Sequence, residues 1–376
     1  MKILYFSSLA AKSGGPAMSV SLTISGLNKL GIKTAVIQYP LADGDVLRSK
    51  NVDVHFASSP IENKFKFSLK LKKEISMLGE FDIYHAQGLW IYATYALIDV
   101  ARQKNRPYLI TPRGMLYPQD IAKNSTFFKK LSLWWRLKDD LNRAACVHVT
   151  CADEMNYCRQ LGITAPIAII PNPVEIIDYA EQKQDDIFRL GYLGRLSPRK
   201  NVEALIRAFA NLGDKVKKAE LLIIGGGDDK YEQFLKNEVV RLNLSNVRFV
   251  GFLSGKEKDE AIASCSVLAM PSEFENLGNV ILEGLVRGIP CIATKGAPWQ
   301  ELETEHCGWW VDYNQDAITQ AISDAIDTNS DELQQMGQRG RQLMEQRYSV
   351  DAVASKMKNL YEWVLGEGNK PDFVYY

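Results

Sequence analysis

The chain has 376 residues, of which 46% are hydrophobic and 24% charged, and its formal net charge is zero. This composition is ordinary for a globular protein, and no apolar run approaches the roughly 20 residues that span a bilayer. Because a single hydrophobic core stops growing at about 250–300 residues, the length predicts two domains.

The N-terminal segment, MKILYFSSLA, lacks the long apolar region and the cleavage site of a signal peptide, so it predicts a first core strand. The six cysteines are spread through apolar or helical stretches and form no C-x-x-C pair. They predict buried free thiols in a reducing cytoplasm. These cysteines are Cys146, Cys151, Cys158, Cys265, Cys291 and Cys307.

The net charge of zero hides an asymmetry between the two parts of the chain. Residues 1–170 contain 22 Lys and Arg against 13 Asp and Glu, a net charge of +9, and the remainder carries −9. Such an asymmetry points to an interaction surface on one part. Chance variation between two solvated surfaces is the alternative.

Short apolar runs alternate with helical patterns through the first half of the chain. The pattern at Pro16–Leu30 is typical, since proline stands in its first turn and Gly31 ends it. The alternation predicts a parallel sheet with helices on both faces. The strands that we expect are Ile3–Ser7, Thr34–Gln38, Val52–Phe56, Ile83–His85, Tyr108–Thr111, Val147–Thr150 and Ile167–Ile170.

The alternation breaks at IIPNPVEI (169–176), where two prolines precede a polar stretch. We interpret Pro171–Asp186 as a linker between an N-terminal domain (1–170) and a C-terminal domain (171–349). An amphipathic helix in residues 350–376 is expected to pack back on the first domain. The second domain repeats the alternation, with strands expected at Phe188–Leu193, Leu221–Ile224, Val247–Val250, Val267–Met270 and Cys291–Ala293.

Motifs at the carboxyl ends of these strands are the candidates for a site, because open parallel sheets bind ligands there. Gly14 and Gly15 follow the first strand and precede a helix. Glycines let the backbone approach a phosphate, and a helix N-terminus attracts an anion. A loop that needs glycine only for its turn geometry is an equal alternative.

Two cations follow the strand that begins the second domain, in GYLGRLSPRKN (191–201). Lys200 stands where the next helix begins, although the helix dipole disfavours a cation there. Together with Arg195, it predicts a site for an anion such as a diphosphate. A solvated basic turn is the alternative.

Glycine and carboxylate motifs follow two further strands of this domain. Gly226 lies in LLIIGGGDDKYEQF (221–234), which predicts a tight turn against a ligand or a turn that packing alone demands. Glu275 precedes a helical pattern and Glu283 lies inside it, among apolar neighbours where an unpaired charge is costly. A ligand with two hydroxyls, such as a ribose, would satisfy Glu283. A surface glutamate and an acidic loop are the alternative.

With these motifs in this order, the chain resembles the family-4 retaining glycosyltransferases. Their fold, GT-B, consists of two tandem Rossmann-like, doubly wound α/β domains that face a cleft. The resemblance covers essentially the whole chain: the Gly-Gly loop, G-R-x-x-x-x-K-N, the strand before G-G-G-D, and E-x7-E before GIPCIAT. HAQGLW, TPRGMLYP, NLGNV and GAPWQELETEHCGWWV are similar to a bacterial subgroup that builds surface polysaccharides such as O-antigen, lipopolysaccharide and capsule.

The resemblance implies roles for the residues singled out above. Arg195 and Lys200 would hold the diphosphate of a UDP- or GDP-linked sugar, and Glu283 would bind its ribose. Glu275 would hold the hydroxyls of the donor sugar, with the backbone amides of Asn276, Leu277, Gly278 and Asn279. Gly14 and Gly15 would close over the diphosphate from the other domain.

The chain departs from the family pattern at two positions of the first domain. His85 is present in DIYHAQGLW, but Gln87 replaces a second histidine, and Arg113 stands where many relatives carry histidine. Gln87 can hydrogen-bond a hydroxyl but is no base, and Arg113 suits a phosphate or a hydroxyl. The resemblance implies retention by front-face attack, in which the leaving diphosphate takes the proton of the acceptor. It implies no cofactor and no metal ion.

Two stretches of the first domain are basic and apolar together. NKFKFSLKLKKEISML (63–78) contains five lysines, and FFKKLSLWWRLK (127–138) begins a helical face of Phe127, Leu131, Trp134 and Leu141 beside Lys130 and Lys138. Such patterns suit an anionic membrane surface, and a face turned toward the core is the alternative. We expect a cytoplasmic enzyme, peripheral on the inner face of the cytoplasmic membrane, with an acceptor on polyprenyl diphosphate and no nucleic acid partner.

Two other functions remain open on the sequence. A nucleotide-sugar 2-epimerase can share the two-domain shape, but it would need more acid and base groups than four histidines provide. A non-catalytic sugar-binding protein of two doubly wound domains is usually exported, and the first residues do not form a signal peptide. Labelled nucleotide-sugars would distinguish transfer, epimerisation and simple binding.

Overall fold

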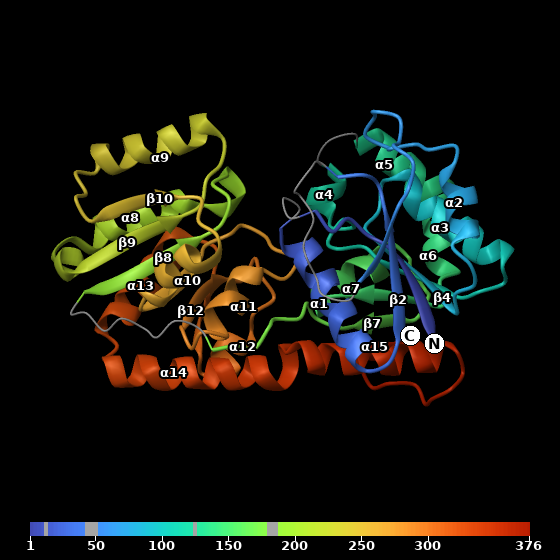
Figure 1. The fold of residues 1–376 in the computed structure, drawn as a ribbon. Helices are drawn as coiled ribbons and strands as arrows, with labels where there is room; N and C mark the ends of the chain where they lie inside the picture. The colour runs from blue at the N-terminus through green and yellow to red at the C-terminus, as the bar shows by residue number, and fades with distance from the viewer. Residues whose placement is uncertain (11–13, 42–51, 123–125, 179–186) are drawn as a thin grey trace. The chain divides into compact units, whose positions relative to one another are not determined.

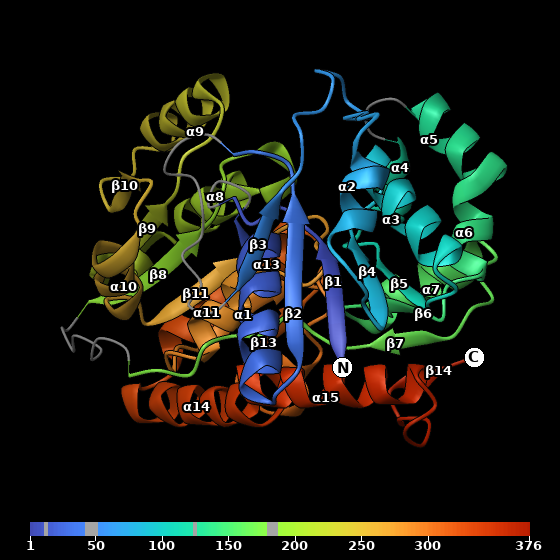
Figure 2. The ribbon, with the colours of Figure 1, turned by 45° about the vertical axis from the view of Figure 1, so that its right-hand side comes forward.

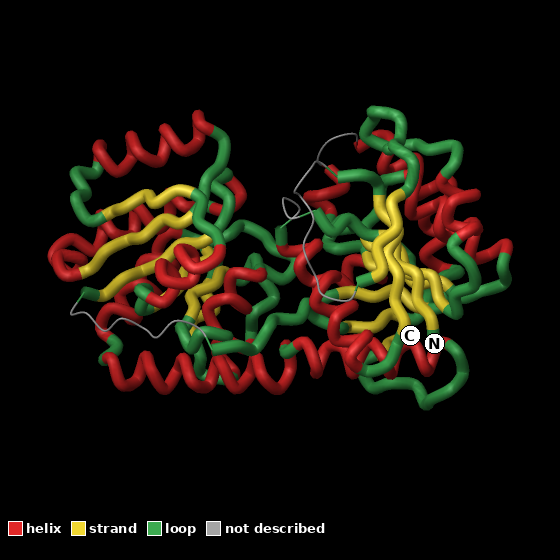
Figure 3. Tube along the Cα trace, viewed as in Figure 1, coloured by secondary structure: helices red, strands yellow, loops and turns green. Residues whose placement is uncertain are grey.

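The computed structural model describes residues 1–10, 14–41, 52–122, 126–178 and 187–376 (Figure 1). The chain forms two compact units, which are described separately. Unit 1 contains Met1–Pro173 and Val350–Tyr376, and unit 2 contains Val174–Ser349. The division therefore falls inside the stretch interpreted as a linker, of which residues 179–186 lie outside the described part. Each unit contains one sheet and several helices (Figure 3).

Unit 1 is built on an eight-stranded sheet in the order β14-β7-β6-β5-β4-β1-β2-β3. All neighbouring strands are parallel except β14, which pairs antiparallel with β7. Successive buried residues of β1 enter different hydrophobic clusters, so both faces of the sheet carry a core. The strands are β1 (Lys2–Phe6), β2 (Lys33–Gln38), β3 (Asp53–Phe56), β4 (Ile83–Gln87), β5 (Tyr108–Thr111), β6 (Cys146–Val149), β7 (Ile167–Ile169) and β14 (Val374–Tyr375).

The last helix of the chain belongs to unit 1 and packs against its first helix (Figure 2). The contact is close, because a Cβ atom on Gly26 would lie 2.6 Å from the Cβ of Ala354. The helices of unit 1 are α1 (Gly15–Lys29), α2 (Leu71–Met77), α3 (Tyr92–Gln103), α4 (Pro118–Ala122), α5 (Thr126–Ser132), the π-helical turn η2 (Leu133–Leu137), α6 (Lys138–Asn142), α7 (Ala152–Gln160) and α15 (Val350–Val364).

Unit 2 contains a six-stranded parallel sheet in the order β10-β9-β8-β11-β12-β13, with hydrophobic clusters on both faces. Its strands are β8 (Phe188–Leu193), β9 (Ala219–Ile224), β10 (Val247–Gly251), β11 (Val267–Met270), β12 (Cys291–Thr294) and β13 (Gly308–Val311). Its helices are η3 (Pro198–Lys200), α8 (Val202–Leu212), η4 (Gly213–Lys218), α9 (Asp229–Arg241), α10 (Gly255–Ala263), α11 (Asn279–Leu285), α12 (Glu301–Thr304), α13 (Gln315–Asp327), α14 (Ser330–Leu343) and η5 (Met344–Tyr348).

The predicted pair of doubly wound α/β domains is confirmed, and each expected strand is present to within two residues. The sequence predicted the edge strands β3 and β10 but not the other two edge strands, β13 and β14. β13 has four residues and begins with glycine, and β14 has only two residues, so neither offers the long apolar run of a central strand.

Three further observations concern the whole described chain. All six cysteines are buried and free, as the sequence predicts. Among the described residues, no helix is long and apolar enough to cross a bilayer. The same residues include no group of three or more His, Cys, Asp and Glu side chains that could hold a metal ion.

Candidate functional site

The strand order of unit 2 reverses at β8. The chain passes from β8 to β9 and β10 on one side, and later to β11, β12 and β13 on the other. Open parallel sheets bind ligands outside their carboxyl ends at such a reversal. The loop after β8 carries Lys200, and the loop after β11 carries Glu275. The topology therefore brings two of the predicted residues to the place where a ligand is expected.

Lys200 and Glu275 form an ion pair at this edge of the sheet. The Nζ atom of Lys200 donates to Oε1 of Glu275, and the two side chains are only 19% and 10% exposed. Beside them, burial and the charge of Glu275 raise the pKa of Tyr192, whose hydroxyl donates to the carbonyl of Arg195 at 2.8 Å. The resemblance assigns the lysine and the glutamate to different parts of a donor, whereas here each is the partner of the other.

The loop after β8 also presents a cation that has no ion-pair partner among the described residues. Arg195 is exposed, and its guanidinium forms no ion pair or hydrogen bond with any other described residue. Arg199 is instead engaged, because its guanidinium lies 5.1 Å from the ring centre of Phe274 and its carbonyl accepts from the amide of Glu273. The loop therefore combines an open cation, Arg195, with two engaged ones, Arg199 on the ring of Phe274 and Lys200 in its ion pair with Glu275.

Packing explains two of the three glycines after β9. A Cβ atom on Gly225 would lie 1.9 Å from the carbonyl oxygen of Gly194, and one on Gly227 would lie 2.1 Å from that of Leu196. These contacts exclude any side chain, so the packing interpretation holds at both positions. Gly226 differs, because a Cβ atom there would meet nothing within 4 Å. Its lack of a side chain is thus not required by the packing of unit 2.

The loop that carries Glu275 is fixed by its neighbours before α11 begins. The amide of Glu275 donates to the carbonyl of Gly296 at 2.7 Å, and the indole of the buried Trp299 donates to the carbonyl of Leu277. Gly278 has a φ of 79°, in the left-handed region that favours glycine. The residues that lead into α11 are Asn276, Leu277, Gly278 and Asn279.

Glu283 lies on α11, and its charge already has a partner within unit 2. Its carboxylate forms an ion pair with Lys258 of α10, and both side chains are 28% exposed. Sequence periodicity could not show this, because the lysine comes from another helix. Glu283 is nevertheless accessible enough to exchange this partner for a ligand.

In unit 1, Gly14 caps α1 with a φ of 63° and a ψ of −134°. Residues with side chains rarely adopt this conformation, so turn geometry alone requires a glycine there. Gly15 is half-buried and opens the helix. Residues 11–13 of the same loop lie outside the described part of the chain.

A chain of hydrogen bonds crosses the carboxyl ends of the unit 1 strands. Nε2 of His148 lies 2.8 Å from the carbonyl oxygen of Ile170, and Nδ1 lies 3.0 Å from Oγ1 of Thr111. Burial, followed by the charge of Arg113, lowers the pKa of His148 to about 4, so its ring is neutral at pH 7. A carbonyl oxygen only accepts. Nε2 of His148 therefore carries the proton, and Nδ1 accepts from the threonine hydroxyl.

This proton order continues into His85. The hydroxyl proton of Thr111 is donated to His148, so Thr111 accepts a hydrogen bond from Nε2 of His85 at 2.7 Å. Because Nε2 of the neutral His85 carries the proton, Nδ1 accepts from the hydroxyl of Tyr361 at 2.8 Å. Tyr361 comes from α15 and is also hydrogen-bonded to Tyr5. His85 is 0% exposed, and burial lowers its pKa well below the usual value. Both ring nitrogens are thus occupied, so His85 orders the cluster and offers no polar atom to a ligand.

Gln87 is the member of this cluster that retains a donor. Its Oε1 accepts from Nε of Arg113 at 2.9 Å. Its Nε2 lies 3.2 Å from Nε2 of His85, but that nitrogen donates to Thr111 in the order derived above. The amide protons of Gln87 consequently lack a good acceptor among these groups, and a ligand hydroxyl would provide one.

Arg113 places a half-buried positive charge at the same edge. It has a φ of 58°, which is uncommon for a residue with a side chain. Its guanidinium also donates to Oδ1 of Asn172 at 2.6 Å and to Oγ of Ser19 at 3.3 Å. Burial lowers the pKa of Arg113 to about 10, against the charge of Glu154, so it remains a cation at pH 7. A cation whose hydrogen bonds go to neutral oxygens suits a phosphate or a hydroxyl.

The structure thus joins His85, Gln87 and Arg113 in one cluster, as their shared assignment requires. Sequence reasoning missed the residues that hold them in place: Ser19, Thr111, His148, Asn172 and Tyr361. Asn172 could have been found from the sequence, because it stands between two prolines directly after an expected strand, where ligands bind. Tyr361 gave no such signal, since it belongs to the apolar stripe of the last helix.

Two protein-family models match the chain in succession. The glycosyl transferase 4-like domain matches residues 14–173, and the domain of glycosyl transferases group 1 matches residues 174–343. The boundary between them coincides with the division between the two units.

Curated relatives match either the whole chain or about half of it. The O-antigen biosynthesis glycosyltransferase WclY of Escherichia coli is 23% identical over 98% of this chain and 99% of its own. An uncharacterised glycosyltransferase of Methanocaldococcus jannaschii is 28% identical over 48% of this chain and 46% of its own length. A GDP-mannose-dependent mannosyltransferase of Corynebacterium glutamicum, acting on a monoacylated phosphatidylinositol monomannoside, is 28% identical over 45% of each chain. The chain therefore spans about half the length of these last two relatives.

Solved structures share the fold over nearly the whole chain. A sucrose-phosphate synthase from Thermosynechococcus elongatus has a TM-score of 0.78, with 18% identity over 97% of this chain and 99% of its own. Anabaena HepE in complex with UDP and glucose has a TM-score of 0.75, with 19% identity over 95% and 98%. The two family models, the relatives and the fold agree. The chain belongs to the family-4 glycosyltransferases, which have the GT-B fold.

Proposed function

We propose that the protein is a retaining glycosyltransferase that moves a hexose-type sugar from a nucleotide-sugar to a lipid-linked glycan, in the synthesis of a bacterial surface polysaccharide. The observation that carries the proposal is the Lys200–Glu275 ion pair at the strand reversal of unit 2, beside the open cation Arg195. A cation and a carboxylate at one point match the two parts of a sugar diphosphate. The name of the Escherichia coli relative, which refers to O-antigen biosynthesis, supports the pathway.

In this proposal the cations of the β8 loop hold the donor diphosphate. Arg195 is exposed and available to a phosphate oxygen, and Lys200 exchanges its carboxylate partner for another one. Gly226, with open space where a side chain would stand, lets the nucleotide approach the backbone. Glu283 exchanges Lys258 for the ribose hydroxyls. The HepE complexes with UDP and with UDP-glucose are consistent with a UDP-linked donor, and the mannosyltransferase relative with a GDP-linked one.

Glu275 would hold the transferred sugar. When Lys200 turns to the diphosphate, the carboxylate can accept hydrogen bonds from sugar hydroxyls, assisted by backbone amides at Asn276–Asn279. Both side chains are poorly solvated, and an unpaired charge in such a place raises the free energy of the protein. Before the donor binds, the ion pair avoids this cost for both groups. The pair therefore suits a ligand that has both an anionic part, for Lys200, and a hydroxyl-rich part, for Glu275.

The proposed reaction is a front-face substitution. The bond between the anomeric carbon and the diphosphate oxygen breaks, and the acceptor oxygen bonds to the same face of that carbon. The acceptor proton passes to the departing diphosphate, so no side chain need act as the base. Arg195 and Lys200 stabilise the charge that develops on the diphosphate, and the protein aligns the reactants.

The polar cluster of unit 1 is proposed as the acceptor or sugar contact. Gln87 contributes the donor that lacks an acceptor, and Arg113 contributes a cation. His85 acts as a positioning residue, because its own nitrogens are occupied by Thr111 and Tyr361.

The acceptor would be reached at an anionic membrane surface. Phe127, Phe128, Trp134 and Trp135 on α5 and η2 are between 70% and 82% exposed, beside the exposed Lys130. Phe127 and Trp134 of the predicted helical face are therefore turned to solvent, whereas Leu141 of the same predicted face is fully buried. The π-helical turn at 133–137 explains the difference, because its wider winding shifts the faces before and after it. Exposed aromatic residues among cations are typical of helices at a membrane interface.

Incubation with radiolabelled UDP- and GDP-sugars and a prenyl-diphosphate-linked glycan tests the proposal. We expect transfer with retained anomeric configuration, and slow donor hydrolysis when the acceptor is omitted. Lys200→Ala should reduce both, whereas Lys256→Ala, which removes an exposed lysine of another ion pair in unit 2, should reduce neither. Epimerised nucleotide-sugar as the product, or no turnover of any donor, would contradict the proposal.

A further inference from the structure

Unit 1 contains a cavity of about 720 Å³ that the proposed reaction does not use. It lies between the loop at 63–67, the start of α3, and the segment formed by α5 and η2. Its walls are mainly aromatic: Phe65, Phe67, Trp90, Tyr92, Tyr95 and Trp135. This volume falls within the range of small-molecule sites, and apolar walls are usual in such sites.

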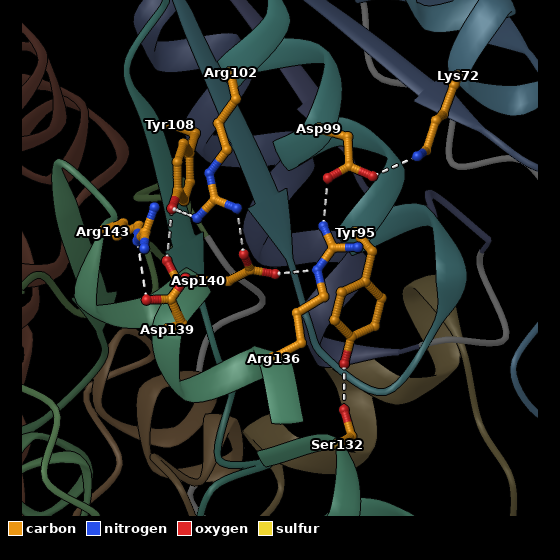
Figure 4. A network of polar contacts seen from close by, with 10 residues as sticks. All are labelled: Lys72, Tyr95, Asp99, Arg102, Tyr108, Ser132, Arg136, Asp139, Asp140 and Arg143. Atoms are coloured by element: carbon orange, nitrogen blue, oxygen red, sulfur yellow. Dashed lines mark hydrogen bonds and ion pairs between the residues drawn. The ribbon is translucent and has the colours of Figure 1, made fainter. Parts of the chain in front are cut away.

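A network of ion pairs holds the wall of the cavity in place (Figure 4). Arg136 of η2 binds Asp99 of α3 and, at 2.9 Å, Asp140 of α6. Asp140 is 0% exposed and also binds Arg102. The hydroxyl of Tyr95 lies 2.6 Å from that of Ser132. These contacts join η2 to α3, so the cavity is formed before any ligand arrives. They also neutralise Arg136.

The remaining charges on the cavity wall are positive. Lys64 and Lys129 line it, and no carboxylate is among its described lining residues. Lys64 is exposed and forms no ion pair with another described residue. Lys129 lies 5.7 Å from the ring centre of Trp90, whose buried indole N–H has no hydrogen-bond partner among the described residues. The cavity therefore matches a molecule with an apolar part and an anionic or oxygen-rich head.

The cavity begins close to the polar cluster. Trp90, on its wall, is only three residues after Gln87. Three residues of fully extended chain span at most about 11 Å. A head group of the size of a diphosphate could therefore leave the cavity and carry its glycan toward Gln87.

We propose that this cavity binds the first isoprene units of a polyprenyl diphosphate that carries the acceptor glycan. The inference rests on the proposed function and names the lipid that its acceptor site takes. Flat, unsaturated isoprene units suit aromatic walls, which favour contact with the faces and edges of π systems. A flexible saturated chain gains less from such walls. Lys64 and Lys129 face the diphosphate, and the exposed aromatic residues of α5 and η2 lie at the lipid surface.

The chain offers two matched pairs of variants for the test. Trp135 and Phe128 line the cavity, whereas their neighbours Trp134 and Phe127 do not. All four are at least 70% exposed, so none of the alanine variants should prevent folding. Calorimetric titration of the full chain with farnesyl diphosphate should show at least fivefold weaker binding for Trp135→Ala and Phe128→Ala. The affinities of Trp134→Ala and Phe127→Ala should stay within twofold of the parent.

Two further titrations define the occupant. Farnesol, which lacks the head group, should bind at least fivefold more weakly than farnesyl diphosphate. Dodecyl diphosphate, with a saturated chain, should also bind at least fivefold more weakly. Equal affinity of the saturated and prenyl diphosphates would place an acyl chain in the cavity and overturn the assignment. An equal loss of farnesyl diphosphate affinity in both members of each pair would indicate non-specific binding to the exposed aromatic residues. That result would also overturn the assignment.

The binding test is independent of turnover. Farnesyl diphosphate that binds through Trp135, in a protein that transfers no sugar, would contradict the proposed function and leave the cavity assigned. If the protein transfers sugar but all four variants bind farnesyl diphosphate with the same affinity, the cavity assignment is contradicted and the proposed function is supported.

Discussion

Lys200 and Glu275, 75 residues apart in the chain, are joined in one ion pair at the carboxyl edge of the unit 2 sheet. Neither side chain is more than 19% exposed. A poorly solvated charge is costly without a partner, so a ligand that separates the pair must satisfy both groups. A nucleotide-sugar does so, since its diphosphate and its sugar hydroxyls lie side by side. The pair is thus the main physical constraint on what unit 2 binds.

The first prediction concerns Glu275→Ala. It should leave nucleoside-diphosphate affinity unchanged or raise it, because Lys200 no longer has to leave a carboxylate. Turnover should fall about a hundredfold, or roughly 3 kcal/mol, because the sugar becomes cation-like during transfer. Calorimetry and single-turnover transfer measure the two effects. Weaker binding of the bare nucleotide would show that Glu275 belongs to the nucleotide site.

The second prediction separates Glu283 from its ion-pair partner. Glu283→Ala should weaken UDP or GDP binding, because the ribose loses its acceptor. Lys258→Ala, the matched control, breaks the same ion pair but keeps the carboxylate, so its affinity should remain near that of the parent. An equal loss of nucleotide affinity in the two variants would show that Glu283 only stabilises α11 through its ion pair and does not bind the ribose.

Metal removal gives a third prediction. Transfer should continue in EDTA at the rate seen without it, because Arg195 and Lys200 carry the charge of the leaving diphosphate in the proposed mechanism. The rate is measured before and after dialysis against the chelator. Complete loss that Mn²⁺ restores would show that a metal ion performs this task.

The fourth prediction follows from His148, whose pKa is lowered from about 6.5 to about 4. Between these values the unfolded chain binds more protons, so this contribution to stability is complete above pH 6.5 and is lost as the pH falls toward 4. It amounts to roughly 3 kcal/mol. Burial raises the pKa of Glu154, which acts in the opposite direction and offsets part of the loss.

Replacement of His148 by Asn should therefore flatten the dependence of stability on pH in this window. Scanning calorimetry between pH 4.5 and 7.5 measures the dependence. His306→Asn is the control, because His306 is exposed and its positive φ suits asparagine. An unchanged slope in His148→Asn would assign the acid sensitivity to other groups.

The fold could be predicted from the sequence because buried parallel strands are continuous apolar runs between helical patterns. The same rule placed Lys200, Glu275 and Gln87 at strand ends, where ligands bind. Two edge strands, β13 and β14, escaped prediction because β13 has four residues and begins with glycine, and β14 has only two residues.

Contacts between distant segments could not be predicted. Lys258 reaches Glu283 from another helix, and Tyr361 reaches His85 from 276 residues away. The aromatic cavity likewise joins residues 63–67 to the segment around Trp135. Its basic and aromatic composition was visible in the sequence, but its shape depends on the π-helical turn and on the ion pairs of Arg136.

The central claim is that the donor diphosphate binds at Lys200, and titration calorimetry tests it most directly. UDP and GDP are titrated into the parent, Lys200→Ala and Lys256→Ala. The loss of a charge-assisted hydrogen bond predicts that the better nucleotide binds Lys200→Ala about 1.5–3 kcal/mol more weakly, roughly tenfold to a hundredfold in affinity. Lys256→Ala should bind as the parent does. Equal affinity in all three proteins would contradict the account.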